Sequence, residues 1–185
     1  RVDEMLDMAR SVRSKRFLYI RNFMPHLGYN QQSAWIDQGE IRQDFYALQR
    51  SGEGTAAQRQ YLNHQRPTEE LYDCQTDPLN LDNLADDSRY HQRLVTMRQQ
   101  LQQRMIESRD LGLVPEIELW RSTAGSTPMQ WGATKAFNPK AIWSAANLVG
   151  SNDQASILAT LQAPDASKRY WAAVSCHSLD PLPPK

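Results

Sequence analysis

The sequence predicts an α+β fold in which a small antiparallel sheet is packed by a long helix and followed by an α-helical extension. Three observations lead to this prediction. Strand-forming residues gather at Val12 and at residues 17–20. Apolar residues recur at helical spacing between about residues 87 and 108. From Asn138 the composition becomes rich in alanine, the residue with the highest helix propensity.

Length, charge and cysteine content limit the classes of protein. The 185 residues suffice for one domain or one and a half. Lys plus Arg and Asp plus Glu number 21 each, and this net charge of zero argues against a general binder of nucleic acid or of anionic membranes. There is no run of 18 apolar residues, so no membrane span is expected. Cys74 and Cys176 are two isolated thiols, which give weak support for a disulfide.

The first predicted element is an antiparallel hairpin over residues 7–23, with Ser14-Lys15 as a two-residue connection. The hairpin carries five basic residues that could be taken for an anion-binding site: Arg10, Arg13, Lys15, Arg16 and Arg21. The favoured interpretation is a charged, solvent-exposed face of a two-sided sheet.

Two short helices are predicted between residues 39 and 63. Ile41, Phe45 and Leu48 form one apolar stripe. Residues 51–54 interrupt it and offer glycine for a left-handed cap. Thr55 can cap the second helix, which ends near Asn63. The aromatic residues of this region are expected in the core rather than in a ligand site: Trp35, Phe45, Tyr46 and Tyr61.

A third strand is predicted at residues 70–73 and should join the small sheet. Asp77-Pro78 makes a turn, and Asn83 can hold the chain before Leu84. Asp86 or Asp87 then caps the long helix, which runs from about residue 87 to about residue 108. Its apolar stripe should lie across one sheet face and consists of Tyr90, Leu94, Met97, Leu101 and Met105.

Residues 107–132 are punctuated by Gly, Pro, Ser and Thr, which is typical of a loop. After them, Asn138-Pro139 begins a helix that Gly150 ends, and Asp153 can cap a second helix. Pro164-Asp165 marks another turn before a third helical stretch, which contains Trp171.

Residues 69–87 read EELYDCQTDPLNLDNLADD, which gives a short strand, an Asp-Pro turn, an Asn-Leu-Ala step and the start of a long polar-faced helix. This order resembles the C-terminal subdomain of the sulfatases, the alkaline-phosphatase-like hydrolases of sulfate esters and sulfamates. The N-terminal stretch resembles an Arg-Met-Asp-Glu step followed by VR-x-KR-x-YIRNFMP in the same family. The matching residues are Arg1, Asp3, Glu4, Val12, Arg13, Lys15, Arg16, Tyr19, Ile20, Arg21, Asn22, Phe23, Met24 and Pro25, with Val2 and Phe17 matching by type only.

The resemblance implies where the chemistry lies. Sulfatases keep their nucleophile, a formylglycine, and their calcium ligands in a larger N-terminal domain, and no part of this sequence matches that domain. The chain is therefore expected to be a C-terminal fragment of a sulfatase that is non-catalytic alone. Its expected partners are the missing N-terminal catalytic domain and, in the parent enzyme, a sulfated carbohydrate substrate. A periplasmic or secreted location is implied in the same way.

The segment after the long helix resembles the tail RDLG-x-x-PE-x-E of a bacterial subset of sulfatases, through Arg109, Asp110, Leu111, Gly112, Pro115, Glu116 and Glu118. Without a catalytic domain to wrap over, the segment would expose Leu113, Ile117, Leu119 and Trp120. The helices after residue 138 resemble HEAT repeats, although only one and a half copies are present and about three are needed for stable stacking. The resulting division is a sulfatase C-terminal subdomain (1–108), a wrapping loop (109–137), partial HEAT-like repeats (138–177) and a disordered tail (178–185).

Candidate substrate contacts come from the same resemblance. Residues 25–29 form a turn-rich segment that leaves the sheet edge, a frequent place for functional residues. In the sulfatases this loop would run towards the mouth of the active-site cleft, where His26 and Tyr29 would touch substrate. The alternative is that His26, a lone histidine after proline, is a plain surface residue.

Two other motifs do not qualify as sites. Asp86-Asp87 looks like a pair of calcium ligands, but a hard cation needs about six oxygen ligands, and helix capping explains the pair. Residues 126–130 look like the sulfatase nucleophile motif, but Gln130 stands where arginine is required. No metal or cofactor site is therefore expected within the chain.

Two further functions stay open. One is a helical-repeat module that binds a protein partner, and the other is a non-functional gene fragment. On its own, the chain is expected to be marginally stable or to associate, because its sheet would lack the domain that it normally abuts.

Overall fold

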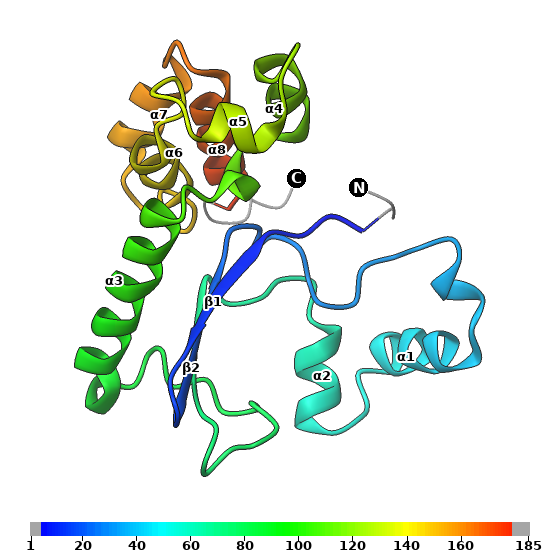
Figure 1. Cartoon of the computed structure of the whole chain (residues 1–185). Helices are drawn as coiled ribbons and strands as arrows, with labels where there is room; N and C mark the ends of the chain where they lie inside the picture. The colour runs from blue at the N-terminus through cyan, green and yellow to red at the C-terminus, as the bar shows by residue number, and fades with distance from the viewer. Residues whose placement is uncertain (1–4, 179–185) are drawn as a thin grey trace.

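The computed structural model describes residues 5–178 and confirms the α+β fold (Figure 1). The sheet has three strands in the order β1-β2-β3, and both pairings are antiparallel. The strands are β1 (Ala9–Arg13), β2 (Phe17–Asn22) and β3 (Glu69–Asp73). Residues 1–4, which carry part of the resemblance to the sulfatases, lie outside the described residues. The predicted tail after Ser178 also lies outside them.

The hairpin of β1 and β2 closes one residue later than the sequence predicts. The Ser14 amide donates a hydrogen bond of 2.8 Å to the Phe17 carbonyl. The Ser14 hydroxyl also accepts one of 2.8 Å from the Phe17 amide. The last residues paired in the ladder are Arg13 and Leu18. The connection between the strands is Ser14-Lys15-Arg16, one residue longer than predicted.

The outer edge of β3 is covered by the segment that follows it. The Asn83 side chain accepts hydrogen bonds from the amides of Leu71 (2.9 Å) and Ala85 (3.0 Å) and donates one to the Glu69 carbonyl (3.1 Å). The Leu84 amide donates to the Leu71 carbonyl at 2.8 Å. Asn83 thus holds the chain before Leu84, as predicted, and it also closes an edge that would otherwise present unpaired backbone groups.

Helix α3 (His91–Glu107) packs along β1 and β2 (Figure 1). The Asp87 carboxylate accepts a hydrogen bond of 2.9 Å from the Arg89 amide and starts the short 3-10 helix η2 (Ser88–Tyr90) that leads into α3. The predicted stripe is confirmed, because the buried residues of α3 are Leu94, Met97, Leu101 and Met105. Tyr90 is partly buried against the same core.

Residues 24–68 form an excursion on the side of the strands away from α3 (Figure 1). It contains the 3-10 helix η1 (Ile36–Gln38) and the helices α1 (Glu40–Ser51) and α2 (Ala56–Leu62). Both predicted caps are confirmed. Gly52 ends α1 with a φ of 71°, and Thr55 forms a capping box with Gln58 at the start of α2.

The predicted burial of this excursion is wrong for several side chains. Trp35 is 82% exposed, Tyr61 is 40% exposed, and Ile41 of the expected stripe is 72% exposed. Helix α1 packs chiefly against η1 and α2, so its outer face has no cover within residues 5–178. Of the apolar stripe, Phe45 packs on Tyr61 of α2 at 5.3 Å between ring centres, whereas Ile41 has no such cover among the described residues.

Residues 109–137 are not the continuous loop that the sequence predicts. They contain the 3-10 helix η3 (Leu111–Leu113) and the short helices α4 (Glu116–Ser122) and α5 (Pro128–Gly132). A capping box between Thr127 and Gln130 starts α5. Local capping thus overrides the glycine and serine content of this segment.

The apolar patch predicted for this segment is only partly exposed. Ile117 and Trp120 are 57% and 68% exposed, as expected. Leu113 is buried and Leu119 packs against the core, so exposure is the wrong prediction for these two residues.

The last three helices begin where the sequence predicts. Asn138 and Asp153 accept amide hydrogen bonds at the starts of the first two, and Gly150, with a φ of 78°, ends the turn between them. The helices are α6 (Pro139–Ala146), α7 (Gln154–Leu161) and α8 (Ala166–Ser178). None of the helices described between residues 5 and 178 combines the length and apolar character needed to cross a bilayer.

Two of these helices, α6 and α8, pack on the core of the sheet. The ring of Phe23, which follows β2, lies 5.7 Å from the rings of both Trp143 in α6 and Trp171 in α8. The indole N–H of Trp171 donates a hydrogen bond of 2.7 Å to the Leu113 carbonyl. One hydrophobic core therefore joins the sheet, α3 and the C-terminal helices.

Candidate functional site

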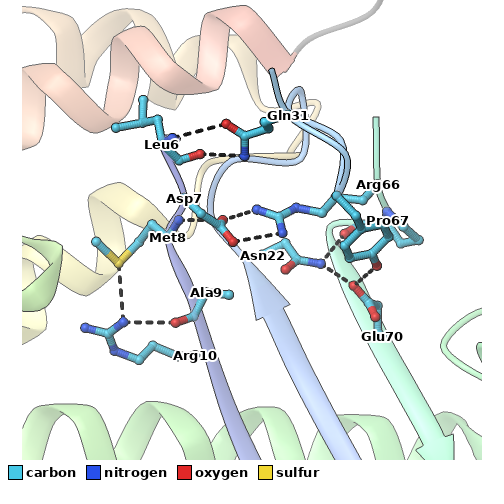
Figure 2. A network of polar contacts seen from close by, with 11 residues as sticks. Leu6, Asp7, Met8, Ala9, Arg10, Asn22, Gln31, Arg66, Pro67 and Glu70 are labelled. Carbon is cyan, nitrogen blue, oxygen red and sulfur yellow. Dashed lines mark hydrogen bonds and ion pairs between the residues drawn. The ribbon is translucent and has the colours of Figure 1, made fainter. Parts of the chain in front are cut away.

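His26 and Tyr29 lie on the loop that follows β2. Met24 at the start of the loop is 1% exposed and anchors it in the core. Further along, the side chain of Gln31 exchanges two hydrogen bonds, of 2.8 and 3.1 Å, with the backbone of Leu6 (Figure 2). The loop is thus tied to the body of the molecule on both sides of the candidate residues.

Glu70 of β3 is the centre of the polar contacts around Tyr29. The Tyr29 hydroxyl donates to one carboxylate oxygen at 2.6 Å, the Asn22 amide donates to the same oxygen at 2.5 Å (Figure 2), and the Tyr72 hydroxyl donates to the other at 2.6 Å. Glu70 is 3% exposed. Burial, and then the hydrogen bond to Glu70, raise the pKa of Tyr29 and of Tyr72 above the ordinary value of 10.0. Both phenols therefore remain hydrogen-bond donors at neutral pH.

Glu70 is not among the site residues predicted from the sequence, although the sequence contains a signal for it. Successive residues of a strand face opposite sides of the sheet. Glu69 faces α3, where it accepts hydrogen bonds of 2.7 and 2.6 Å from Arg98, and Glu70 faces the excursion. If both faces of the strand are covered, each of two adjacent carboxylates faces one covered side. Each of them then needs hydrogen-bond donors from that side.

His26 contacts the C-terminal helix rather than Tyr29. Its ring lies 4.4 Å from that of His177 in α8, in an edge-on arrangement. Its Nδ1 atom is buried and has no hydrogen-bond partner among residues 5–178. Burial, and then the charges of His177 and Arg66, lower the pKa of His26 below its ordinary value of 6.5. The imidazole is therefore neutral at neutral pH, and its buried Nδ1 atom is unpaired within the described part of the chain.

Tyr29 lines a cavity whose described lining does not include His26, and both residues lie near Arg66. The Arg66 guanidinium is 5.5 Å from the centre of the Tyr29 ring, and its charge acts on His26. Arg66 forms an ion pair with Asp7 (Figure 2). Its charge is thus neutralised within the site rather than left for an anionic ligand.

A cavity of about 220 Å³ lies beside Tyr29, between the sheet and α2. Its lining consists of Ile20, Tyr29, Ala57, Gln60, Tyr61, Glu70, Tyr72, Asn80 and Leu81. Glu70 is the one charged residue in this lining. Because a carboxylate repels an anion at short range, this cavity does not suit a sulfate group.

The described residues do not fit calcium or a formylglycine nucleophile. Within residues 5–178, no group of three or more His, Cys, Asp or Glu side chains is placed to hold a metal ion. The Asp87 carboxylate pairs with the Arg89 guanidinium at 2.6 Å. The Thr127 hydroxyl accepts from the Gln130 amide at 3.2 Å, so residues 126–130 form a helix cap. No chemical step is assigned to these groups.

The five basic residues of the hairpin do not form one anion site. Arg10 and Arg16 are paired with carboxylates at 2.6 and 2.5 Å. Arg21 is only 4% exposed and donates to a backbone carbonyl of the turn after α6 at 2.6 Å. The interpretation as a solvent-exposed face is correct for Arg13 and Lys15 and wrong for Arg21, whose guanidinium is buried beneath the C-terminal helices.

The comparisons with known proteins give one informative relative. No known family model matches the chain. The chain is 36% identical over 119 residues to a protein named ulvan-active sulfatase from Formosa agariphila, and this match covers 64% of the chain and 20% of that protein. The chain therefore spans about a fifth of the length of the curated relative, and over that part it is related in sequence to a sulfatase.

Proposed function

We propose that the chain is the C-terminal part of a sulfatase whose catalytic residues lie in a separate N-terminal portion. The similarity to the ulvan-active sulfatase is the observation that carries this proposal. The order of β3, the covering segment and α3 supports it, because this is the order expected from the resemblance of residues 69–87 to sulfatase C-terminal subdomains. The chain would be non-catalytic alone.

In this proposal the chain packs against the catalytic portion and shapes the rim of the substrate cleft. Trp35, Ile41 and Tyr61 provide an exposed apolar surface of the kind that a neighbouring domain covers. His26 is neutral and can exchange a hydrogen bond with a sugar hydroxyl or a sulfate oxygen. The Tyr29 hydroxyl donates its hydrogen bond to Glu70. Tyr29 would therefore contact substrate through its aromatic ring.

The substrate class that we propose is a sulfated polysaccharide, in line with the name of the relative. An alkaline-phosphatase-like N-terminal portion would supply the formylglycine nucleophile and the calcium that neutralises the sulfate group. A periplasmic or secreted location accords with a polymeric substrate, which cannot easily enter a cell.

A second candidate function is a helical module that binds a protein. Helices α6 and α7 each pack on α8, and proteins built from HEAT-like repeats bury their helices by stacking of this kind. Leu158 on α7 is 62% exposed, and Trp120 and Met129 on the preceding short helices are 68% and 80% exposed. These side chains form the surface on which such a partner would dock.

The two candidates are separated by comparing the isolated 185-residue chain with the whole product of the reading frame that encodes it. Both are assayed for sulfate release from sulfated oligosaccharides and from an aryl sulfate. We expect release by the whole product and none by the isolated chain. Release by the isolated chain would overturn the proposal, and a whole product without a Cys- or Ser-x-Pro-x-Arg motif would favour the interaction module.

The rim role is tested by His26→Ala in the whole product. We expect kcat/KM to fall by about five- to tenfold, mainly through KM, because one hydrogen bond to substrate contributes roughly 1 kcal/mol. His91→Ala, a change at an exposed position on α3, is the matched control and should leave both constants unchanged. A normal KM in His26→Ala would remove His26 from the substrate rim.

A further inference from the structure

The carboxylate of Glu70 is buried without a cation. Its three hydrogen-bond donors are an amide and two phenols, none of which carries a positive charge. Within residues 5–178 Glu70 forms no ion pair, and the nearby Arg66 is paired with Asp7. A buried charge is usually balanced by a counter-charge. The unbalanced carboxylate of Glu70 therefore favours the binding of a cationic group from outside the chain.

The cavity beside Glu70 has the chemistry of a cation site. Tyr29, Tyr61 and Tyr72 line it together with Glu70, and aromatic faces attract a cation through the ring quadrupole. The rest of the lining carries no charge and consists of Ile20, Ala57, Leu81, Gln60 and Asn80. The volume of about 220 Å³ is smaller than the roughly 300–1,000 Å³ of ordinary ligand pockets. It therefore suits a single side chain better than a sugar unit.

We propose that this cavity receives the arginine side chain of a partner polypeptide that packs on α2 and residues 79–81. A carboxylate offers about four lone-pair positions, and three are already used at Glu70, so one remains for an N–H donor. A guanidinium is planar, stacks on aromatic rings and is more weakly hydrated than an ammonium group. It therefore loses less on entering an apolar cavity walled by tyrosine.

The mouth of the cavity indicates that the arginine belongs to a protein segment. Leu81 and Tyr61 line the cavity and are 43% and 40% exposed, and Leu79, two residues before Leu81, is 76% exposed. The small acidic cavity therefore opens beside exposed apolar side chains. An apolar surround that excludes water from a central arginine is a common arrangement at protein interfaces. A free amine or an amino sugar would leave these leucines uncovered. This inference does not depend on the proposed sulfatase function.

The test uses N-acetyl-argininamide as a probe and N-acetyl-citrullinamide as its neutral match. The probe is titrated into the chain while the ring resonances of the tyrosines are followed by NMR. We expect saturable shifts for Tyr29, Tyr61 and Tyr72 with a Kd of about 1–10 mM, as befits one side chain without its surroundings. Citrullinamide should bind at least tenfold more weakly.

Variants separate the cavity from the general charge of the protein. Glu70→Gln should weaken argininamide binding by about tenfold or more, and Glu53→Gln, which removes an equal charge at an exposed position, should not. Tyr61→Ala removes a half-exposed wall of the cavity, together with the ring contact to Phe45, and leaves Glu70 in place. It should also weaken binding, which keeps the test decisive if Glu70→Gln fails to fold. Equal binding of argininamide and citrullinamide, or the absence of saturable shifts, would overturn the proposal.

Discussion

Glu69 and Glu70 are adjacent on β3, yet they belong to opposite faces of the sheet. Glu69 meets α3, and burial alone would raise its pKa, but the hydrogen bonds from Arg98 and Tyr19 lower that pKa below its ordinary value. Glu70 meets the excursion, where neutral donors surround it. The same residue type is thus a satisfied ion-pair partner on one face and an unpaired charge beside a cavity on the other.

The partial burial of His26 leads to the prediction that the stability of the folded chain depends on pH. Burial, with His177 and Arg66 as the charged neighbours, lowers the pKa of His26 in the folded state below 6.5, its value in the unfolded chain. Between these two pKa values the unfolded state binds the additional proton. The contribution of a neutral His26 to the free energy of unfolding is therefore fully present above about pH 6.5. It is lost as the pH falls from about 6.5 to the lower pKa of the folded state.

This pH dependence is measured as the melting temperature from about pH 7.5 down to about pH 5. We expect a steeper fall in the unmodified chain than in His26→Gln, because glutamine does not titrate. His91→Gln, at an exposed position on α3, should keep the steep fall. If His26→Gln were as steep as the unmodified chain, the burial of a neutral His26 would not be a determinant of stability.

At the scale of an element, α3 shows how a local pattern becomes a packed surface. Leu94, Met97, Leu101 and Met105 are each 5% exposed or less, and together they form a single stripe along the helix. The stripe meets the sheet because Asp87 fixes where the helical turns begin. The spacing of the apolar residues therefore determines which side of α3 is apolar. The position of the cap determines that this side points towards the sheet.

Leu101→Ala should destabilise the chain by about 2–5 kcal/mol, because Leu101 is 3% exposed and its removal leaves a cavity against the sheet. The free energy of unfolding is obtained from urea denaturation. Leu158→Ala is the matched control: this leucine on α7 is 62% exposed, and its loss should stay within about 0.5 kcal/mol. A loss below about 1 kcal/mol at Leu101 would mean that the stripe does not pack on the sheet.

The short helices α4 and α5 illustrate the limit of local patterns. Each has seven residues or fewer, and isolated helices of such length are not stable on their own. The Thr127–Gln130 capping box and the packing of Leu119 on the core hold them in place. Periodicity over a few residues cannot predict them, because tertiary contacts supply most of their stability.

For the molecule as a whole, the sheet, α3 and the C-terminal helices share one core through Phe23, Trp143 and Trp171. They are therefore expected to unfold together. The division of the chain at residues 109–137 stays a prediction about its origin, but in energetic terms the two parts are not independent.

The whole chain is also expected to associate. Large apolar side chains are exposed at several places, and the most exposed are Trp35 (82%), Met129 (80%), Leu79 (76%), Ile41 (72%) and Trp120 (68%). The apparent melting temperature and the sedimentation coefficient should therefore depend on protein concentration.

The double variant Trp35→Gln with Trp120→Gln should reduce this dependence without lowering stability, since both indoles lie mostly in solvent. Gln92→Ala with Gln99→Ala, two exposed polar positions on α3, is the control and should change nothing. A sharp two-state melt of a monomer at every concentration would contradict the prediction.

The amino-acid sequence alone is enough to predict the strands, the stripe of α3 and most helix ends. Gly52, Thr55, Asn138 and Asp153 act on backbone groups within a few residues, so their effects can be predicted locally. The motif at residues 69–87 is also sufficient to indicate a relation to the sulfatases, and the 36% identity to a sulfatase supports that relation.

Which side chains are buried, and which residues meet, depends on the tertiary structure. The fold places His26 against His177, joins Trp171 to the sheet, leaves Trp35 in solvent and encloses Glu70 among tyrosines. These outcomes depend on segments that are far apart in the chain. The burial and charge balance of a side chain depend on the residues that surround it in the folded structure. Residue spacing within one segment cannot predict contacts with distant segments.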